Sequence, residues 1–258
     1  MKAGANHQHW ALATAVLVVF VMPVPLGVHA ATQFGECFSD PSTSGPLSGR
    51  TIIVDPGHGG SDPGAVNTAT DPDLVEKTLN LEISTILKDL LVAEGARVCL
   101  TRTGDETLSN ADRYTFANAH GGHALVSIHL NSVSDPNVDY TMTMWGKREK
   151  DLALAQAVLP ALVSGLATFP DGTDSPIDSG RVAQFASGVL LKSNMPAIIV
   201  EGVFMSNTAE ASYLADSTQG RETQIAEAIR DGLVAFFQQQ GGSDGGGGKG
   251  NGKGGGKP

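Results

Sequence analysis

Apolar residues alternate along the chain between short runs typical of buried strands and longer stretches with helical spacing. The short runs predict strands at residues 51–54, 97–101, 124–128 and 197–200, and a further run predicts an edge strand at 140–145. Apolar residues spaced three or four apart predict helices over residues 74–95, 110–119, 150–166 and 219–239. Strands separated by helices predict one three-layer α/β domain, with a mostly parallel sheet and helices on both faces.

The first thirty residues have the pattern of a signal peptide. Lys2 precedes an apolar stretch that closes with Val28-His29-Ala30, and small or aliphatic residues at these positions predict cleavage after Ala30. An uncleaved membrane anchor is the alternative, but Pro23 and Pro25 shorten the apolar run below the roughly 20 residues that a span needs. We therefore expect an exported protein, in the periplasm or at the extracellular cell wall.

The other end of the chain is rich in Gly and Lys, which predicts a flexible tail at 241–258 because such a segment buries too little apolar area to order itself. The expected organisation is a signal peptide at 1–30, an N-terminal loop segment at 31–49, the folded domain at 50–240 and this tail.

Composition and charge narrow the possible functions. The 258 residues include 27 Asp and Glu against 17 Lys and Arg, a formal net charge of −10, and 41% are hydrophobic. This composition is typical of a folded domain and not of a disordered chain. An acidic surface repels nucleic acid and anionic lipid, whose binding requires clustered Lys and Arg. We therefore expect no nucleic-acid partner, and no membrane span once the signal peptide is removed.

The two cysteines, Cys37 and Cys99, fit neither a zinc ribbon nor a CxxC redox site. An exported chain can join such a pair in a disulfide, whereas Cys99, inside an apolar run, could equally be a buried thiol. The sequence leaves both alternatives open.

Titratable side chains follow three of the predicted strands. His58 lies in the Gly-rich loop after the strand 51–54, and His129 and Glu201 directly follow the strands 124–128 and 197–200. Ligands of open α/β sheets collect at the carboxyl ends of strands, so these side chains are expected at one edge of the sheet.

A fourth candidate, Glu76, lies on the apolar face of the predicted helix 74–95, where a carboxylate requires a nearby cation. Two histidines and one carboxylate, with the fourth position left to water, are the usual ligands of a catalytic zinc ion. We therefore predict that His58, Glu76 and His129 bind one zinc ion, and that Glu201 is the catalytic base beside it.

Each of these residues also has a simpler alternative role. A histidine near a sheet end can be a hydrogen-bonded structural residue, and Glu76 can be an acid favoured by the helix dipole. Glu201 can be a buried acid that pairs with Arg102 or Arg113. The Gly-rich loop could cradle a phosphate, but it lacks the GxxxxGK[ST] pattern. Three candidate ligands are expected close to one another, and one zinc site explains all three, whereas the simpler roles require a separate explanation for each residue.

In their order along the chain, the motifs resemble those of the zinc-dependent N-acetylmuramoyl-L-alanine amidases of the amidase 3 type. The resemblance runs from about Arg50 to Phe237 and rests on Asp55-Pro56-Gly57-His58-Gly59-Gly60, Asp62-Pro63-Gly64-Ala65, Glu76-Lys77, Asn80-Leu81, Thr101-Arg102, Arg113, Ser127-Ile128-His129 with Asn131, Pro196, Glu201, Phe204 and Ser206-Asn207. It implies zinc at His58, Glu76 and His129 and catalysis by Glu201, which agrees with the residue-level prediction. Ser127 and Asn131 are weaker candidates for orienting ligands or contacting the substrate.

The resemblance implies hydrolysis of the amide between the lactyl group of N-acetylmuramic acid and the L-alanine of the peptidoglycan stem, in cell-wall remodelling or cell separation. Peptidoglycan is then the expected partner. Some family members carry an inserted regulatory helix that an activator displaces; the interval between His129 and Glu201 leaves no room for it, and an activator of this chain is unidentified. Two alternatives stay open: a zinc peptidase cutting within the stem peptide, and an inactive wall-binding module.

Overall fold

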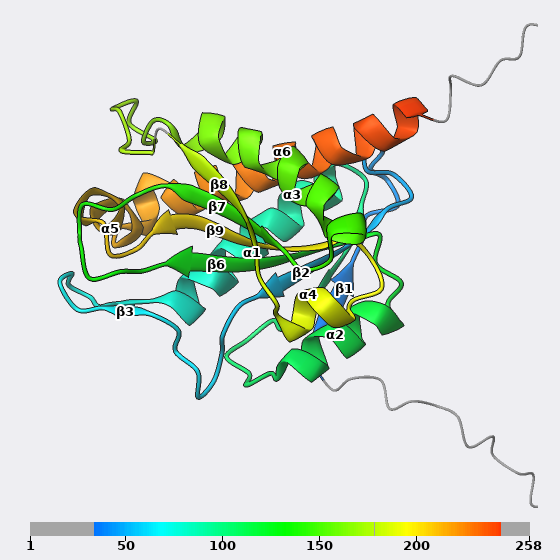
Figure 1. Ribbon diagram of the computed structural model, residues 1–258, viewed down its shortest axis with the longest axis horizontal. Helices are drawn as coiled ribbons and strands as arrows, with labels where there is room; N and C mark the ends of the chain where they lie inside the picture. Colours follow the sequence, from blue (N-terminus) through cyan, green and yellow to red (C-terminus); the bar gives the residue numbers. More distant parts are fainter. Residues whose placement is uncertain (1–33, 178, 244–258) are drawn as a thin grey trace, which may run out of the picture. The chain divides into compact units, whose positions relative to one another are not determined.

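The computed structural model describes residues 34–177 and 179–243 (Figure 1). The predicted signal peptide and most of the predicted tail lie outside the described residues. A mixed sheet of seven strands has the order β1-β5-β2-β6-β9-β7-β8. Its strands are β1 (Glu36–Phe38), β2 (Thr51–Pro56), β5 (Arg97–Leu100), β6 (Ala124–Asn131), β7 (Thr141–Trp145), β8 (Gly180–Gln184) and β9 (Ala197–Phe204). The short strands β3 (Val66–Asn67) and β4 (Leu74–Val75) pair separately.

The central strands β5, β2, β6 and β9 run parallel, while β1 and β7 are antiparallel to their neighbours β5 and β9. The predicted mostly parallel α/β sheet is therefore confirmed. The prediction that residues 140–145 form an edge strand is wrong, because β8 pairs in parallel with the outer side of β7. The sequence of β8, Gly-Arg-Val-Ala-Gln, is too polar and too exposed to have predicted a strand.

Helices cover both faces of the sheet (Figure 1). On one face lie α1 (Glu76–Ala93), α3 (Arg148–Leu166) and α6 (Arg221–Ser243), which pack against one another and on the strands. On the other face lie α2 (Asn110–Ala119) and the short α4 (Gly188–Lys192). The helix α5 (Thr208–Leu214) and a 3-10 turn (Ser217–Gln219) join β9 to α6. This is the predicted arrangement of three layers.

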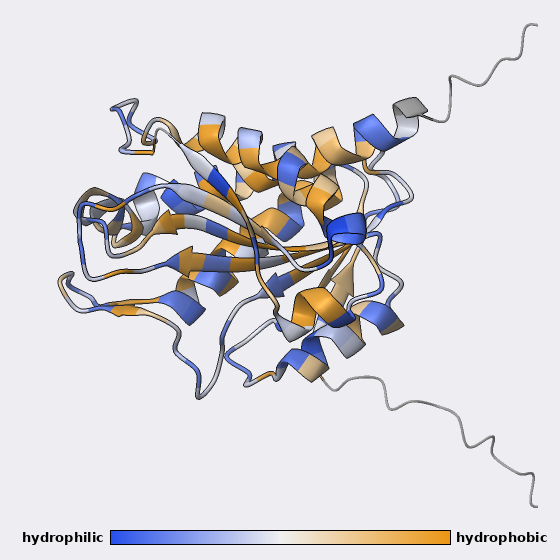
Figure 2. Cartoon of the chain, viewed as in Figure 1, coloured by the Kyte–Doolittle hydropathy of each residue, from blue (hydrophilic) through white to orange (hydrophobic). Residues whose placement is uncertain are grey.

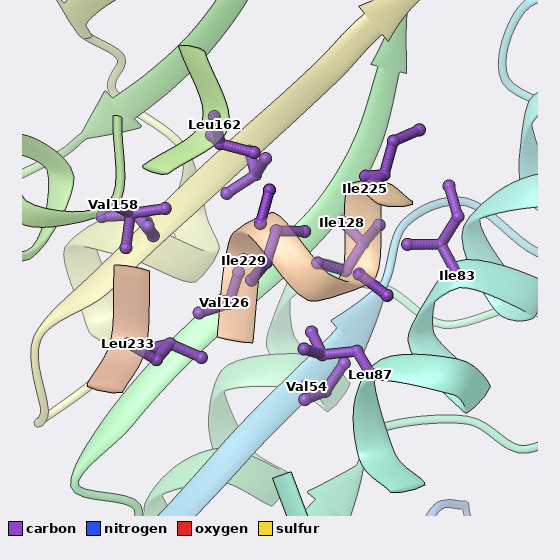
Figure 3. Packing of buried hydrophobic residues seen from close by; sticks show 14 of the residues in the cluster. Val54, Ile83, Leu87, Val126, Ile128, Val158, Leu162, Ile225, Ile229 and Leu233 are labelled. Atoms are coloured by element: carbon purple, nitrogen blue, oxygen red, sulfur yellow. The ribbon is translucent and has the colours of Figure 1, made fainter. Parts of the chain in front are cut away.

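Two buried clusters fill the spaces between the layers, as the alternation of β2 illustrates. Ile52 and Val54 face α1 and α6, whereas Ile53 faces α2 and α4. Figure 3 shows the larger cluster, in which Val54, Val126 and Ile128 of the strands meet residues of α1, α3 and α6. In Figure 2 the hydrophobic positions gather on the strands and on the helix faces that meet them. The strands are buried on both sides, which explains their continuous apolar runs.

The element boundaries differ from the predictions mainly at the ends. α1 begins at Glu76 because Leu74 and Val75 belong to β4, and α6 continues to Ser243, into the predicted tail. The strand β1 lies in the segment that was predicted to be a loop. Its Cys37 is opposite Cys99 of β5 and forms a disulfide with it, so the disulfide alternative is confirmed and the free-thiol alternative is wrong. In the described part of the chain, no helix is long and apolar enough to cross a membrane.

Candidate metal centre and active site

The carboxyl ends of three parallel strands position the candidate site. Strand β2 pairs with β6 through Pro56 opposite Ile128, and β6 pairs with β9 through His129 opposite Glu201. His58 follows β2 by two residues, and Glu76 is the first residue of α1. The sheet register therefore gathers side chains that are more than 140 positions apart in the sequence.

His58, Glu76 and His129 converge on one point. The Nε2 atom of His58 and the Nδ1 atom of His129 each lie 3.1 Å from Oε1 of Glu76. The two imidazole rings meet edge to face, with centroids 4.8 Å apart. One ligand atom from each residue lies within 4.8 Å of the others. Two nitrogen donors and one carboxylate at this separation could hold a single metal ion, and the donor set suits zinc.

The electrostatics of this triad favour a bound cation. Glu76 is only 4% exposed, and its carboxylate accepts hydrogen bonds from the backbone nitrogens of Ala65 (2.8 Å) and Leu130 (3.2 Å). Burial raises the pKa of Glu76, but hydrogen bonds from His129 and His58 outweigh it and hold the pKa well below its usual range. Burial lowers the pKa of His58, whereas the hydrogen bond and charge of Glu76, then those of Asp62, raise it to about 9. The buried carboxylate is thus anionic and stabilises positive charge between the imidazoles.

The glycines of the loop 55–65 make room for these side chains. A Cβ at Gly57 would lie 2.3 Å from the His129 ring, and one at Gly64 would lie 2.5 Å from Oε2 of Glu76. Between them, His58 has a positive φ of 59°, which is rare for a residue with a side chain. The glycine pattern is therefore explained by close packing around the triad, and the phosphate-cradle alternative is not needed.

Two buried arginines hold the backbone of this loop in place. Arg113 donates to Oδ1 of Asp55 and to the carbonyl oxygens of Pro56 and His58, each at 2.7 Å. Arg102 donates to the carbonyl oxygens of Pro56 (3.0 Å) and Gly57 (2.8 Å). Both guanidinium groups are thus engaged with the loop that carries His58. The alternative in which one of them pairs with Glu201 is wrong.

Residue-by-residue reasoning did not single out Asp62, whose Oδ2 lies 2.8 Å from Nδ1 of His58. A carboxylate on the second nitrogen of a metal-binding histidine fixes the orientation of its ring. The spacing of four residues within one tight loop was the available signal.

The two weaker candidates make different contacts. Ser127 donates its hydroxyl to Oδ2 of Asp55 at 2.6 Å, and the side-chain oxygen of Asn131 accepts from the backbone nitrogen of Ser132. Ser127 therefore contributes to the Asp55 network behind the loop, while Asn131 lines the cavity beside the triad. A histidine outside the triad, His123, accepts from the backbone nitrogen of Thr51 at 2.9 Å and is structural.

Glu201 stands beside the triad with an unused oxygen. Its Oε2 is buried and has no hydrogen-bond partner among the described residues. Burial raises the pKa of Glu201 to about 7, an effect that the imidazoles of His129 and His58 oppose and Glu76 reinforces. The side chain lines a cavity of about 420 Å³ that His58, Glu76 and His129 also line. A carboxyl group with a pKa near neutrality, facing a cavity beside a metal site, is suited to accept and return a proton.

Comparison with known proteins places this site in a family. The family model described as N-acetylmuramoyl-L-alanine amidase matches residues 52–235, from β2 into α6. The chain belongs to this amidase family. The matched residues include the triad, Asp62 and Glu201.

Relatives of the amidase family align over about three quarters of the chain. The probable cell wall amidase LytH of Staphylococcus epidermidis is 33% identical over 195 residues, which are 76% of this chain and 61% of LytH. The chain thus spans less than two thirds of that relative. The amidase AmiC2 of Nostoc punctiforme has a solved structure with a TM-score of 0.63 and 31% identity, covering 76% of this chain and 99% of AmiC2. The CwlD amidase from Clostridioides difficile, solved in complex with the GerS lipoprotein, has a TM-score of 0.62 and 28% identity, covering 74% of this chain and 99% of CwlD.

Proposed function

We propose that this protein is a zinc-dependent N-acetylmuramoyl-L-alanine amidase that acts on peptidoglycan. The observation that carries the proposal is the convergence of His58, Glu76 and His129 beside the unpartnered carboxyl oxygen of Glu201, in a chain of the amidase family. His58, Glu76 and His129 hold the metal in this proposal. Zinc, when bound, supplies a Lewis acid that polarises the substrate carbonyl and makes water more acidic.

Glu201 moves the protons of the reaction. It accepts a proton from the attacking water, whose oxygen bonds to the carbonyl carbon of the lactyl group. As the bond from this carbon to the alanine nitrogen breaks, Glu201 returns the proton to the nitrogen. The products are a free lactyl carboxylate on the sugar and a stem peptide with a new amino terminus, so one water is consumed per bond broken. Burial raises the pKa of Glu201, which favours the protonated form that returns the proton to the nitrogen.

The surrounding residues keep the reacting groups in position. Asp62 orients the His58 ring, and Arg102 and Arg113 fix the loop from which this ring projects. Phe185, which is half exposed, lines the same cavity as Glu201 and the triad. Asp62 and the two arginines therefore hold His58 in place, while Phe185 offers exposed apolar surface to the substrate.

The proposed function includes export of the protein and a division of the chain into three segments. The protein carries a signal peptide at 1–30, a catalytic domain at 50–240 and a flexible tail at 241–258, and it acts at the cell wall, in wall remodelling or cell separation. Peptidoglycan is its substrate. The solved complex of CwlD with the GerS lipoprotein supports a search for a protein partner of this chain as well.

The test is mass spectrometry of purified sacculi digested by the protein, with and without a chelator. Stem peptides that begin in L-alanine, lost on chelation and restored by zinc, are expected. Shortened stems that leave the first alanine on the sugar would instead establish a peptidase, and binding without release would establish an inactive wall-binding module.

The variant Glu201→Gln tests the assigned base. It should reduce kcat by about 10²- to 10⁴-fold because proton transfer is lost, while bound zinc measured by elemental analysis stays at one per chain. Loss of zinc in this variant would move Glu201 into the metal-binding set and overturn its assignment.

A further inference from the structure

Two cavities border His58 and His129 of the candidate metal-binding triad, and they differ in the other residues that line them. The larger cavity, of about 420 Å³, is lined by Glu201, Met144 and Phe185 in addition to the triad. The smaller cavity, of about 150 Å³, is lined by Leu108, Asn110 and Ser187. His58, His129 and Ile199 border both cavities. A substrate that passes over the metal therefore extends into two chemically distinct spaces.

The position of Glu201 decides which half of the substrate enters which cavity. A group that returns a proton to the departing nitrogen must lie within hydrogen-bond distance of it. Glu201 lines the larger cavity and not the smaller one. The departing amine, and with it the peptide that the amine begins, must then lie in the larger cavity. The acyl half of the substrate is directed towards the smaller cavity.

Within the larger cavity, Phe185 is the residue best placed to contact the peptide. It is 50% exposed, more than any other large hydrophobic residue of the described chain. Its backbone nitrogen donates to the carbonyl oxygen of Trp145 at 2.9 Å, which anchors the segment between β8 and α4 to β7. An aromatic side chain that projects from this anchored segment and lines the cavity offers apolar area that a bound peptide can cover.

The other residues that line the larger cavity are suited to bind a peptide without forming ion pairs to it. No Lys or Arg is among the residues that line the larger cavity, and its acids, Glu76 and Glu201, are committed to the metal and to the proton. Met144 extends the apolar surface next to Phe185, and Asn131 supplies an amide. The cavity thus fits an extended peptide that is held by apolar contact and by its backbone.

We propose that the larger cavity is the stem-peptide subsite and that Phe185 determines how strongly the enzyme depends on the peptide beyond its first alanine. The inference rests on the proposed amidase function and adds the direction in which the substrate lies. It predicts that Phe185 contributes to binding of the leaving peptide and not to the chemical step.

The test compares Phe185→Ala with the unchanged protein on two synthetic substrates, muramoyl-L-alanine and a muramoyl tripeptide. With the tripeptide, the variant should raise KM by about tenfold and leave kcat within about twofold, because uniform binding is lost. With muramoyl-L-alanine, KM should change by less than about twofold. Phe185→Leu should recover most of the loss. Val182→Ala is the matched control, an exposed apolar residue of β8 that lines neither cavity.

Free stem tripeptide provides a second measurement on the same variants. It should inhibit the unchanged protein competitively, and Phe185→Ala should weaken this inhibition by a similar factor. Equal losses on both substrates, or an unchanged KM for the tripeptide, would overturn the subsite assignment while leaving the amidase intact. If the unchanged protein released no peptide from either substrate, the proposed function itself would fail.

Discussion

Gly57 shows how a single residue connects the loop sequence to the metal site. Its backbone conformation does not require glycine, but its Cα faces the His129 ring so closely that a Cβ would lie 2.3 Å from the ring. The residue is therefore glycine for reasons of space. Sequence reasoning marked the loop as Gly-rich, but it could not tell which glycine is needed for which contact.

The variant Gly57→Ala should displace His129 and weaken zinc binding by at least about tenfold, because a metal site tolerates little movement of its ligands. Competition with a chromophoric chelator measures this affinity. Gly241→Ala is the control, since a Cβ there meets nothing within 4 Å. Unchanged zinc affinity in Gly57→Ala would mean that the loop can shift without moving the ligand.

The buried carboxyl group of Asp139 predicts how the stability of the protein depends on pH. Burial raises its pKa to about 7, the charge of Glu210 adds to the effect, and Arg221 opposes it. The pKa of Asp139 in the folded protein is therefore above the ordinary value of an aspartic acid, so the folded protein favours the protonated carboxyl group. Its contribution to stability is complete below about pH 4 and is lost as the pH rises through about 7.

The variant Asp139→Asn should therefore lose less stability than the unchanged protein between pH 4 and pH 8. An amide oxygen can still accept the hydrogen bond from the Phe204 nitrogen. Urea denaturation at a series of pH values measures the difference. Asp135→Asn is the control, because Asp135 is exposed and its hydrogen bonds to Asn137 lower its pKa. Parallel stability profiles for Asp139→Asn and the unchanged protein would contradict this account.

At the scale of elements, the predictable ones were those with long or strongly apolar patterns. The strands β2, β5, β6 and β9 and the helices α1, α2, α3 and α6 follow the predicted segments closely. The α2 helix matches at both ends: Ser109 and Asp112 form a capping box at its start, and Gly121, with a φ of 62°, follows its end. The strands β1 and β8 escaped prediction because edge strands are short and partly exposed. Their pairing depends on a neighbour that is distant in the sequence.

The disulfide adds a covalent link to the antiparallel pairing of β1 with β5. It joins residues 62 positions apart, and the chain-entropy model assigns about 4 kcal/mol to a loop of this length. Reduction should lower the free energy of unfolding by about 2–4 kcal/mol, as measured by denaturation with and without reductant. The kcat of the folded enzyme should not change, because β5 and β2 separate β1 from β6 and β9.

The doubly substituted variant Cys37→Ser, Cys99→Ser is the control for this experiment. It should have the stability of the reduced protein and show no response to reductant. A response of equal size in this variant would mean that reductant acts elsewhere.

At the scale of the whole molecule, the metal should couple the site to folding. Its candidate ligands come from a loop, a helix and a strand, so an ion bound to all three stabilises only the folded chain. Zinc at one hundred times its dissociation constant should add about 2.7 kcal/mol, seen as a higher Tm than in a chelator. His129→Ala should abolish most of this shift. A shift that survives in His129→Ala would place the ion at another site.

The sequence by itself determined the α/β class, the main helices and strands, and the residues of the candidate metal site. It could do so because hydrophobic periodicity is local and because strand ends in a parallel sheet meet at one edge. Only the tertiary structure decided the edge strands, the disulfide and the arginine support of the His58 loop. It also decided that one carboxyl oxygen of Glu201 lies without a partner beside the triad, and that two cavities border His58 and His129, with Phe185 in the lining of the larger one. These features depend on register and packing between segments far apart in the chain, which no local pattern records.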